Sequence, residues 1–79
     1  MTGASNNINT KIGIKIKLLR TKLGYSQEKL AEHSALNKNS IGAIERGESS
    51  PSIETLERIA IALGIELKEL VDVSKIDLD

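Results

Sequence analysis

Apolar residues recur every three or four positions from Thr10 onward, which is the spacing of helices that bury one face. The first predicted helix runs from about Thr10 to Leu23, and Gly24 follows it as a left-handed stop. Its main apolar stripe holds Ile12, Ile16, Leu19 and Leu23, and a second small patch holds Ile14 and Leu18. This helix therefore has an apolar surface left over after one face packs on a core.

Two short helices are predicted next, and each begins at a side chain that favours helix N-termini. Ser26 caps a helix that ends near His33 or Ser34. After a tight turn, Asn37 caps a helix that ends at Gly47. The inward positions of these two helices are Leu30, Ala31, Ile41 and Ile44.

Ser52 is expected to cap a fourth helix, which Gly64 stops, and a weaker fifth helix runs from about Glu66 to Val71. The buried stripe of the fourth helix is Ile53, Leu56, Ile59, Ala60 and Leu63. No alternating pattern is long enough for a sheet, so the prediction is an all-α, compact five-helix fold. Residues 1–9 are expected to form a flexible N-terminal tail, residues 10–72 the domain, and residues 73–79 a C-terminal tail.

Composition limits what such a chain does. It has 79 residues, no Cys and one aromatic residue, so we expect one small domain with an aliphatic core and no disulfide or thiolate site. Its polar start does not resemble a signal peptide, and no apolar run approaches the ~20 residues that span a bilayer. These features predict a cytoplasmic protein with no membrane partner.

Charge is distributed unevenly although the formal net charge is zero. Residues 1–47 hold eight Lys or Arg against three Glu, a balance of +5, and residues 48–79 hold three against eight, a balance of −5. A first half that forms one side of the domain would make that side a basic patch, which suits a polyanionic partner.

Two short capped helices joined by a tight turn suggest a helix-turn-helix. The outer face of the second of these helices carries Lys38, Asn39, Gly42 and Ala43, which are small or hydrogen-bonding. Small side chains let a helix approach base edges, Lys pairs with guanine and Asn with adenine. Gly42 costs about 1 kcal/mol in mid-helix, and it serves either groove clearance or close packing between helices.

Residues 12–65 resemble the lambda-repressor-like, Cro/repressor-type (Xre-type) helix-turn-helix family. The matching motifs, in order and without a gap, are Ile16-x-x-Leu19-Arg20, Ser26-Gln27-Glu28-x-Leu30-Ala31, Ile41-x-x-Ile44-Glu45-Arg46-Gly47, Pro51-Ser52-x-x-Thr55-Leu56 and Ala60-x-Ala62-Leu63-Gly64-Ile65. The resemblance implies a sequence-specific, double-stranded DNA-binding transcriptional regulator, such as a small prokaryotic or phage repressor, that reads the major groove with its third helix.

The resemblance also implies roles for individual residues. Lys38, Asn39 and Ala43 would face bases, whereas Ser40, Arg46 and the Gly47 amide would meet phosphates. Gln27 would face the DNA backbone and could also brace the first side chain of the third helix, and the helix cap Asn37 completes the DNA-binding set. Arg20 and Glu45 match a structural ion pair.

Apolar residues left over on the last two helices predict a homodimer on a palindromic operator, with Ile61, Leu67 and Val71 at the interface. An alternative is a protein-interaction module of the antitoxin type that uses the same fold, and the Ile14/Leu18 patch supports it. An enzyme is not expected, since the chain has one His, no Cys and no Gly-rich phosphate loop. No metal, cofactor or small-molecule ligand is predicted, and the site of action is the cytoplasm, at the nucleoid.

Overall fold

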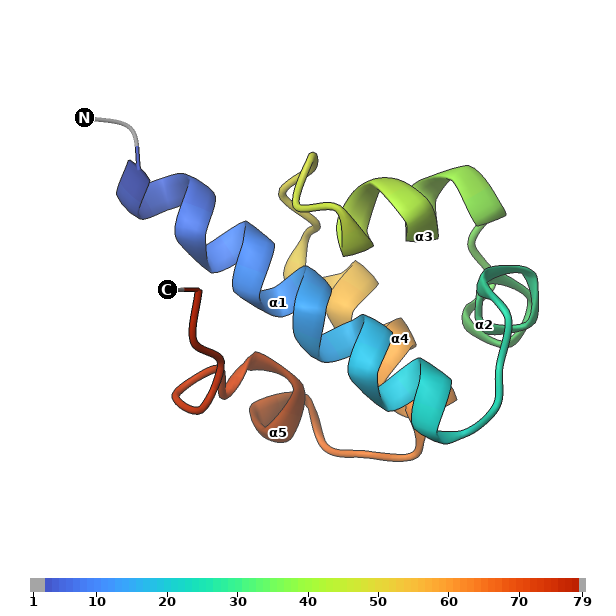
Figure 1. The fold of residues 1–79 in the computed structure, drawn as a ribbon. Helices are drawn as coiled ribbons and strands as arrows, with labels where there is room; N and C mark the ends of the chain where they lie inside the picture. Colours follow the sequence, from blue (N-terminus) through green and yellow to red (C-terminus); the bar gives the residue numbers. More distant parts are fainter. Residues whose placement is uncertain (1–2, 79) are drawn as a thin grey trace.

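Five α-helices follow one another in the computed structural model, which describes residues 3–78. They are α1 (Gly3–Lys22), α2 (Gln27–Ser34), α3 (Lys38–Glu45), α4 (Ile53–Leu63) and α5 (Leu67–Val71). No strand occurs among the described residues, so the all-α, five-helix prediction is confirmed. The long α1 crosses the molecule, with α3 along one edge and α5 along the opposite edge (Figure 1).

Local hydrogen bonds set the helix boundaries where the sequence predicts them. The N-cap residues, in extended backbone conformation, are Ser26, Asn37 and Ser52. The side-chain oxygen of each accepts a hydrogen bond from the backbone N–H three residues later, at 3.0, 2.8 and 3.1 Å. Each bond satisfies one of the N–H groups that a helix start leaves unpaired. Positive φ angles at the predicted stops are confirmed at Gly24, Gly47 and Gly64.

The start of the first helix differs from the prediction. The helix α1 begins at Gly3, inside the segment over residues 1–9 that is predicted as a flexible tail. Residues 1–2 lie outside the described residues. Extending a helix that already exists adds one hydrogen bond for each residue fixed, whereas nucleating one is costly. A polar segment without its own apolar stripe is therefore helical when it precedes a strong helix.

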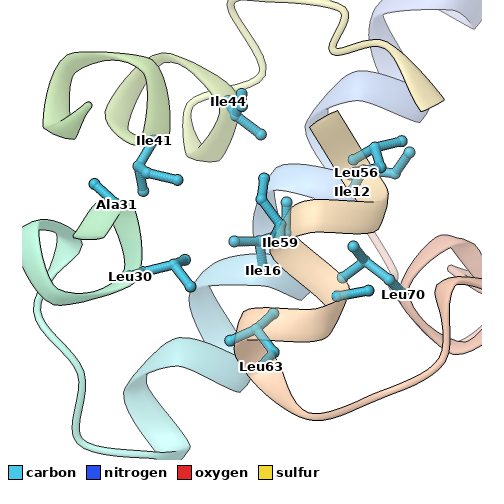
Figure 2. Close-up of a cluster of buried hydrophobic side chains, with 11 residues drawn as sticks. Ile12, Ile16, Leu30, Ala31, Ile41, Ile44, Leu56, Ile59, Leu63 and Leu70 are labelled. Atoms are coloured by element: carbon cyan, nitrogen blue, oxygen red, sulfur yellow. The ribbon is translucent and has the colours of Figure 1, made fainter. Parts of the chain in front are cut away.

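All five helices contribute to one aliphatic core, and their side chains converge on the same interior region (Figure 2). The buried members are Ile12, Ile16, Leu30, Ala31, Ile41, Ile44, Leu56, Ile59, Ala60, Leu63 and Leu70. Two predicted stripe residues are not part of it, since Leu23 is 48% and Ile53 is 68% exposed. Both stand at helix ends, and Ile53 leans off the start of α4 because Cα–Cβ bonds tilt toward the helix N-terminus.

Gly13 lets α1 and α3 pack with their backbones in close approach. A Cβ atom at this position would overlap the carbonyl oxygens of Ile44 and Glu45 at the end of α3. Gly47 makes a similar contact, since a Cβ there would stand 2.9 Å from Thr10 Cα. Two glycines from different segments therefore fix where the end of α3 lies against α1.

The segment after α5 is irregular, as predicted, but it does not separate from the domain at residue 73. Val73 packs against the core, and Lys15 Nζ donates a 2.8 Å hydrogen bond to the Asp72 carbonyl. The Asp72 carboxylate accepts from the hydroxyl and the backbone N–H of Ser74, and these bonds lower the pKa of Asp72. The start of the predicted C-terminal tail is thus part of the folded unit. None of the described helices is both long and apolar enough for a bilayer.

Candidate nucleic-acid interface

A left-handed residue makes the turn between α2 and α3. Ala35 has φ 58° and ψ 39°, and its N–H bonds to the carbonyl groups that end α2. Leu36 N–H then donates to the Ala31 carbonyl at 2.9 Å, which is the pattern of a Schellman C-cap. The chain therefore reverses within three residues, and α3 starts at the Asn37 cap. Sequence reasoning missed this conformation because Ala rarely adopts it.

One face of α3 is anchored and the other is open. Ile41 and Ile44 are buried in the core, whereas Lys38 and Asn39 at the start of the helix are exposed. Ser40 and Ala43 are half-buried. Asn37 is exposed, and its Oδ1 accepts the Ser40 N–H. The structure thus brings the predicted base-facing residues together on the outer surface of α3, while the inner side of α3 is anchored in the hydrophobic core of the domain.

A buried carboxylate joins the first three helices. Arg20 donates to Glu45 through Nε at 2.6 Å and Nη2 at 3.0 Å, and both residues are only 8% exposed. Arg20 Nη1 donates to the Tyr25 carbonyl at 2.8 Å, in the loop before α2. The expected ion pair between α1 and α3 is present, and its two parallel bonds give it a fixed geometry.

This pair does not leave a polar group of Arg20 or Glu45 without a partner. Among the described side chains, no buried nitrogen or oxygen atom lacks a hydrogen bond. The hydrogen bonds to Glu45 are the main cause of a raised Arg20 pKa, so the guanidinium stays charged. A satisfied buried pair adds little net stability, but removing either partner leaves a charge without compensation.

Gln27 belongs to the same network. Its Nε2 donates to Glu45 Oε1 at 3.0 Å, so it braces the end of α3 and not the first side chain, Lys38. Gly42 lies beneath this contact: a Cβ there would stand 3.7 Å from Gln27 Oε1 and 3.0 Å from Arg46 Nη1. Gly42 is buried, and its neighbours at this contact are the ends of two flexible side chains.

Arg46 is engaged within the protein. Its Nε and Nη2 donate to the Glu48 carboxylate at 2.9 and 3.1 Å, and more than half of each side chain is exposed. The pairing raises the pKa of Arg46 and lowers that of Glu48. The Gly47 N–H, which the resemblance places near phosphate, donates to the Ile44 carbonyl at 3.0 Å in this structure.

Sequence reasoning missed Glu48. Residues two apart do not face each other on a helix, so the spacing of Arg46 and Glu48 gave no signal. The left-handed Gly47 between them reverses the chain and brings the two side chains together.

The residues predicted at a dimer interface are not equally accessible. Ile61 on α4 is 72% exposed and Val71 on α5 is 36% exposed. Leu67 is half-buried and packs against the chain's own core. The Ile14/Leu18 patch on α1, which supports the protein-interaction alternative, is also only partly accessible, since Leu18 is 50% exposed and Ile14 is half-buried.

No group of three or more His, Cys, Asp or Glu that could hold a metal ion occurs among the described residues. The geometry offers a helix-turn-helix with a polar outer face, and a sequence profile described as helix-turn-helix matches residues 16–70. The chain belongs to this helix-turn-helix family.

Similar proteins agree with this assignment. The chain is 40% identical over 73 residues to the control protein C.BamHI of Bacillus amyloliquefaciens, covering 91% of this chain and 90% of that protein. It is 37% identical to the phage CTXphi transcriptional repressor RstR of Vibrio cholerae, over 82% of this chain but only 59% of that protein. The solved restriction-modification controller C.AhdI of Aeromonas hydrophila has a TM-score of 0.79 and 38% identity, covering 82% of this chain and 94% of that one.

Family, relatives and site together assign the biochemical role. The helix-turn-helix family and these relatives are transcription regulators rather than enzymes. The chain is a DNA-binding transcription regulator with the lambda-repressor-like helical fold.

Proposed function

We propose that this regulator binds a palindromic operator as a homodimer, in the manner of a restriction-modification controller. Support comes from the relatives that it matches almost from end to end, since two of them are controllers by name and the chain spans at least 90% of each. The phage repressor, in contrast, extends well beyond the matched region. Its site of action is then the cytoplasm, in association with the nucleoid, where operator DNA lies.

The observation that carries the proposal is the two-sided structure of α3. Its inner face is fixed by Ile41 and Ile44, while Lys38 and Asn39 project from its first turn without a protein partner to cover them. Lys and Asn are suited to guanine and adenine edges in the major groove. Ala43, one turn further along, is placed to touch a thymine methyl group.

The remaining residues of the surface would bind phosphate and hold the helix in register. Ser40 offers a hydroxyl beside the first turn, and Arg46 offers a guanidinium at the end of α3. Gln27 and the Asn37 cap act by positioning α3, because their side chains already bond to Glu45 and to the Ser40 N–H. Phosphate contacts set register on the duplex, and base contacts set sequence.

Selection of bound duplexes from a random library tests DNA reading directly. We expect enriched sites with two symmetric halves about one helical turn, ~34 Å, apart. Asn39→Ala should lose about 1–3 kcal/mol at one base position of each half and relax selection there alone. A library with no enrichment, or an Asn39→Ala variant that selects the same sites with equal strength, would contradict the base-reading role. An operator found ahead of restriction-modification genes would support the controller role.

The homodimer has its own test, for which Ile61 is the best probe because the fold does not need its side chain. Sedimentation at micromolar concentration should show a dimer for the natural sequence. Ile61→Asp should shift it to monomer while circular dichroism shows the same helix content, and its unfolding midpoint should no longer depend on protein concentration. Ile53→Asp is the matched control, since Ile53 is similarly exposed on the same helix but outside the proposed interface. A fully dimeric Ile61→Asp variant would show that this part of the interface is wrong.

A further inference from the structure

We propose that Glu48 is an intramolecular competitor for the DNA phosphate at Arg46, and that it lowers affinity for all DNA without changing the sequence that is read. The inference rests on the proposed function, because it takes Arg46 as a phosphate-binding residue. It assigns a role to an acidic residue that stands at the edge of a surface meant for a polyanion.

The first support is the way in which the guanidinium is occupied. Nε and Nη2 both donate to the Glu48 carboxylate, at 2.9 and 3.1 Å. The third nitrogen, Nη1, lies over α3, 3.0 Å from where a Gly42 Cβ would stand. A phosphate that binds the Nε/Nη2 edge of Arg46 would therefore have to displace the carboxylate, since two parallel bonds need one free edge of the fork.

The second support is that Glu48 is held in place by the backbone. Its N–H donates to the Ala43 carbonyl at 2.9 Å, and the Gly47 N–H donates to the Ile44 carbonyl at 3.0 Å. With Gly47 left-handed at φ 73°, these two bonds make a Schellman motif at the end of α3. The carboxylate is thus presented to Arg46 by a fixed turn, so little loop ordering is needed to form the ion pair.

The third support is charge. Glu48 is two residues from Arg46, so a carboxylate released from Arg46 stays near the phosphate that Arg46 then binds. The two negative charges repel each other. DNA binding at this position therefore exchanges one ion pair of Arg46 for another. The exchange contributes less binding free energy than an arginine without an intramolecular partner would. Because a phosphate carries no sequence information, the reduction applies equally to operator and random duplex.

Glu48→Gln tests the proposal, because the amide keeps the size of the side chain and removes its charge. We expect about two- to fivefold tighter binding per protomer, the range of an exposed ion pair, on both operator and random duplex. The slope of log affinity against log salt should steepen by up to about 0.9 per protomer, since Arg46 would then act as a full counter-charge to phosphate. Glu66→Gln removes the same charge beside α5, at the opposite edge of the molecule from α3, and should change binding much less (Figure 1).

A double-mutant cycle with Arg46→Ala separates competition from general charge. If Glu48 acts through Arg46, then Glu48→Gln should tighten binding in the natural sequence and have almost no effect in the Arg46→Ala background. An equal gain in both backgrounds overturns the proposal in favour of long-range repulsion. Weaker binding by Glu48→Gln also overturns it, because Glu48 would then hold Arg46 ready for phosphate.

The same titrations distinguish failure of the Glu48 role from failure of the proposed DNA-binding function. Steep salt dependence in the natural protein with no change in Glu48→Gln removes the competitor role and leaves DNA reading intact. Failure of every variant to bind any duplex overturns both.

Discussion

At the scale of single residues, the Arg20–Glu45 pair makes the sharpest stability prediction. Both groups are buried and joined by two hydrogen bonds. Glu45→Gln should destabilise the domain by about 3–5 kcal/mol, because it leaves the Arg20 charge without a buried partner. Urea unfolding of Arg20→Met, Glu45→Gln and the double variant measures the coupling. Additive losses in the double variant would show that the two side chains do not act as a pair.

Ala35 carries a second prediction at this scale, because it holds a left-handed backbone at φ 58°. This conformation costs an L-residue roughly 1–2 kcal/mol. Glycine avoids that cost, but it loses more conformational entropy than alanine on folding, which costs about 0.5–1 kcal/mol. Ala35→Gly should therefore raise stability by about 0.5–1 kcal/mol, and the unfolding midpoint by several degrees.

Ala62→Gly is the matched control for this change, since Ala62 lies in the right-handed α4. It should lose about 1 kcal/mol in the same thermal unfolding experiment. A lower midpoint for Ala35→Gly would contradict the strain at the turn.

At the scale of helices, the contact between α1 and α3 depends on Gly13 and much less on Gly42. Gly13→Ala should cost about 1–3 kcal/mol in spite of the better helix propensity of Ala, because its Cβ meets fixed backbone carbonyls. A Cβ at Gly42 would meet the ends of the flexible Arg46 and Gln27 side chains, at 3.0 and 3.7 Å, so Gly42→Ala should be neutral or stabilise by up to about 1 kcal/mol. Chemical denaturation of the two variants gives the comparison, and an equal loss in both would refute this account of the interface.

Helix boundaries were predictable where a local signal sets them. The caps Ser26, Asn37 and Ser52 each bond to a neighbour three residues away, so sequence alone identifies them. The early start of α1 has no such signal, since it follows by propagation from a formed helix. The left-handed turn at Ala35 has none either, since no glycine or asparagine marks it. Leu67 shows the same limit: its spacing marks it as apolar, but only the packed structure shows that it covers the chain's own core.

The candidate site likewise has features that the sequence predicts and features that depend on the folded structure. The exposed position of Lys38 and Asn39 followed from the helical period, and the partner of Arg20 followed from a family resemblance. Glu48 was not foreseen, because its contact with Arg46 depends on the left-handed turn at Gly47. The Gln27 partner was also misjudged, since the position of Glu45 relative to α2 is a property of the folded molecule.

At the scale of the whole molecule, zero net charge and DNA binding are compatible because the two signs occupy different parts of the chain. The balance is +5 over residues 1–47, which hold α1 to α3, and −5 over residues 48–79. Charge of this polarity favours approach to a duplex through residues 1–47, which include α3. The strength of that attraction depends on salt.

A salt titration on the selected operator tests most directly our proposal that this chain reads duplex DNA as a dimer. Fluorescence anisotropy with a labelled duplex between 50 and 200 mM salt should show affinity falling by about 10³–10⁵, for a dimer that contacts ~6–10 phosphates. The matching slope of log affinity against log salt is about −5 to −9. A flat response over this range would contradict the account.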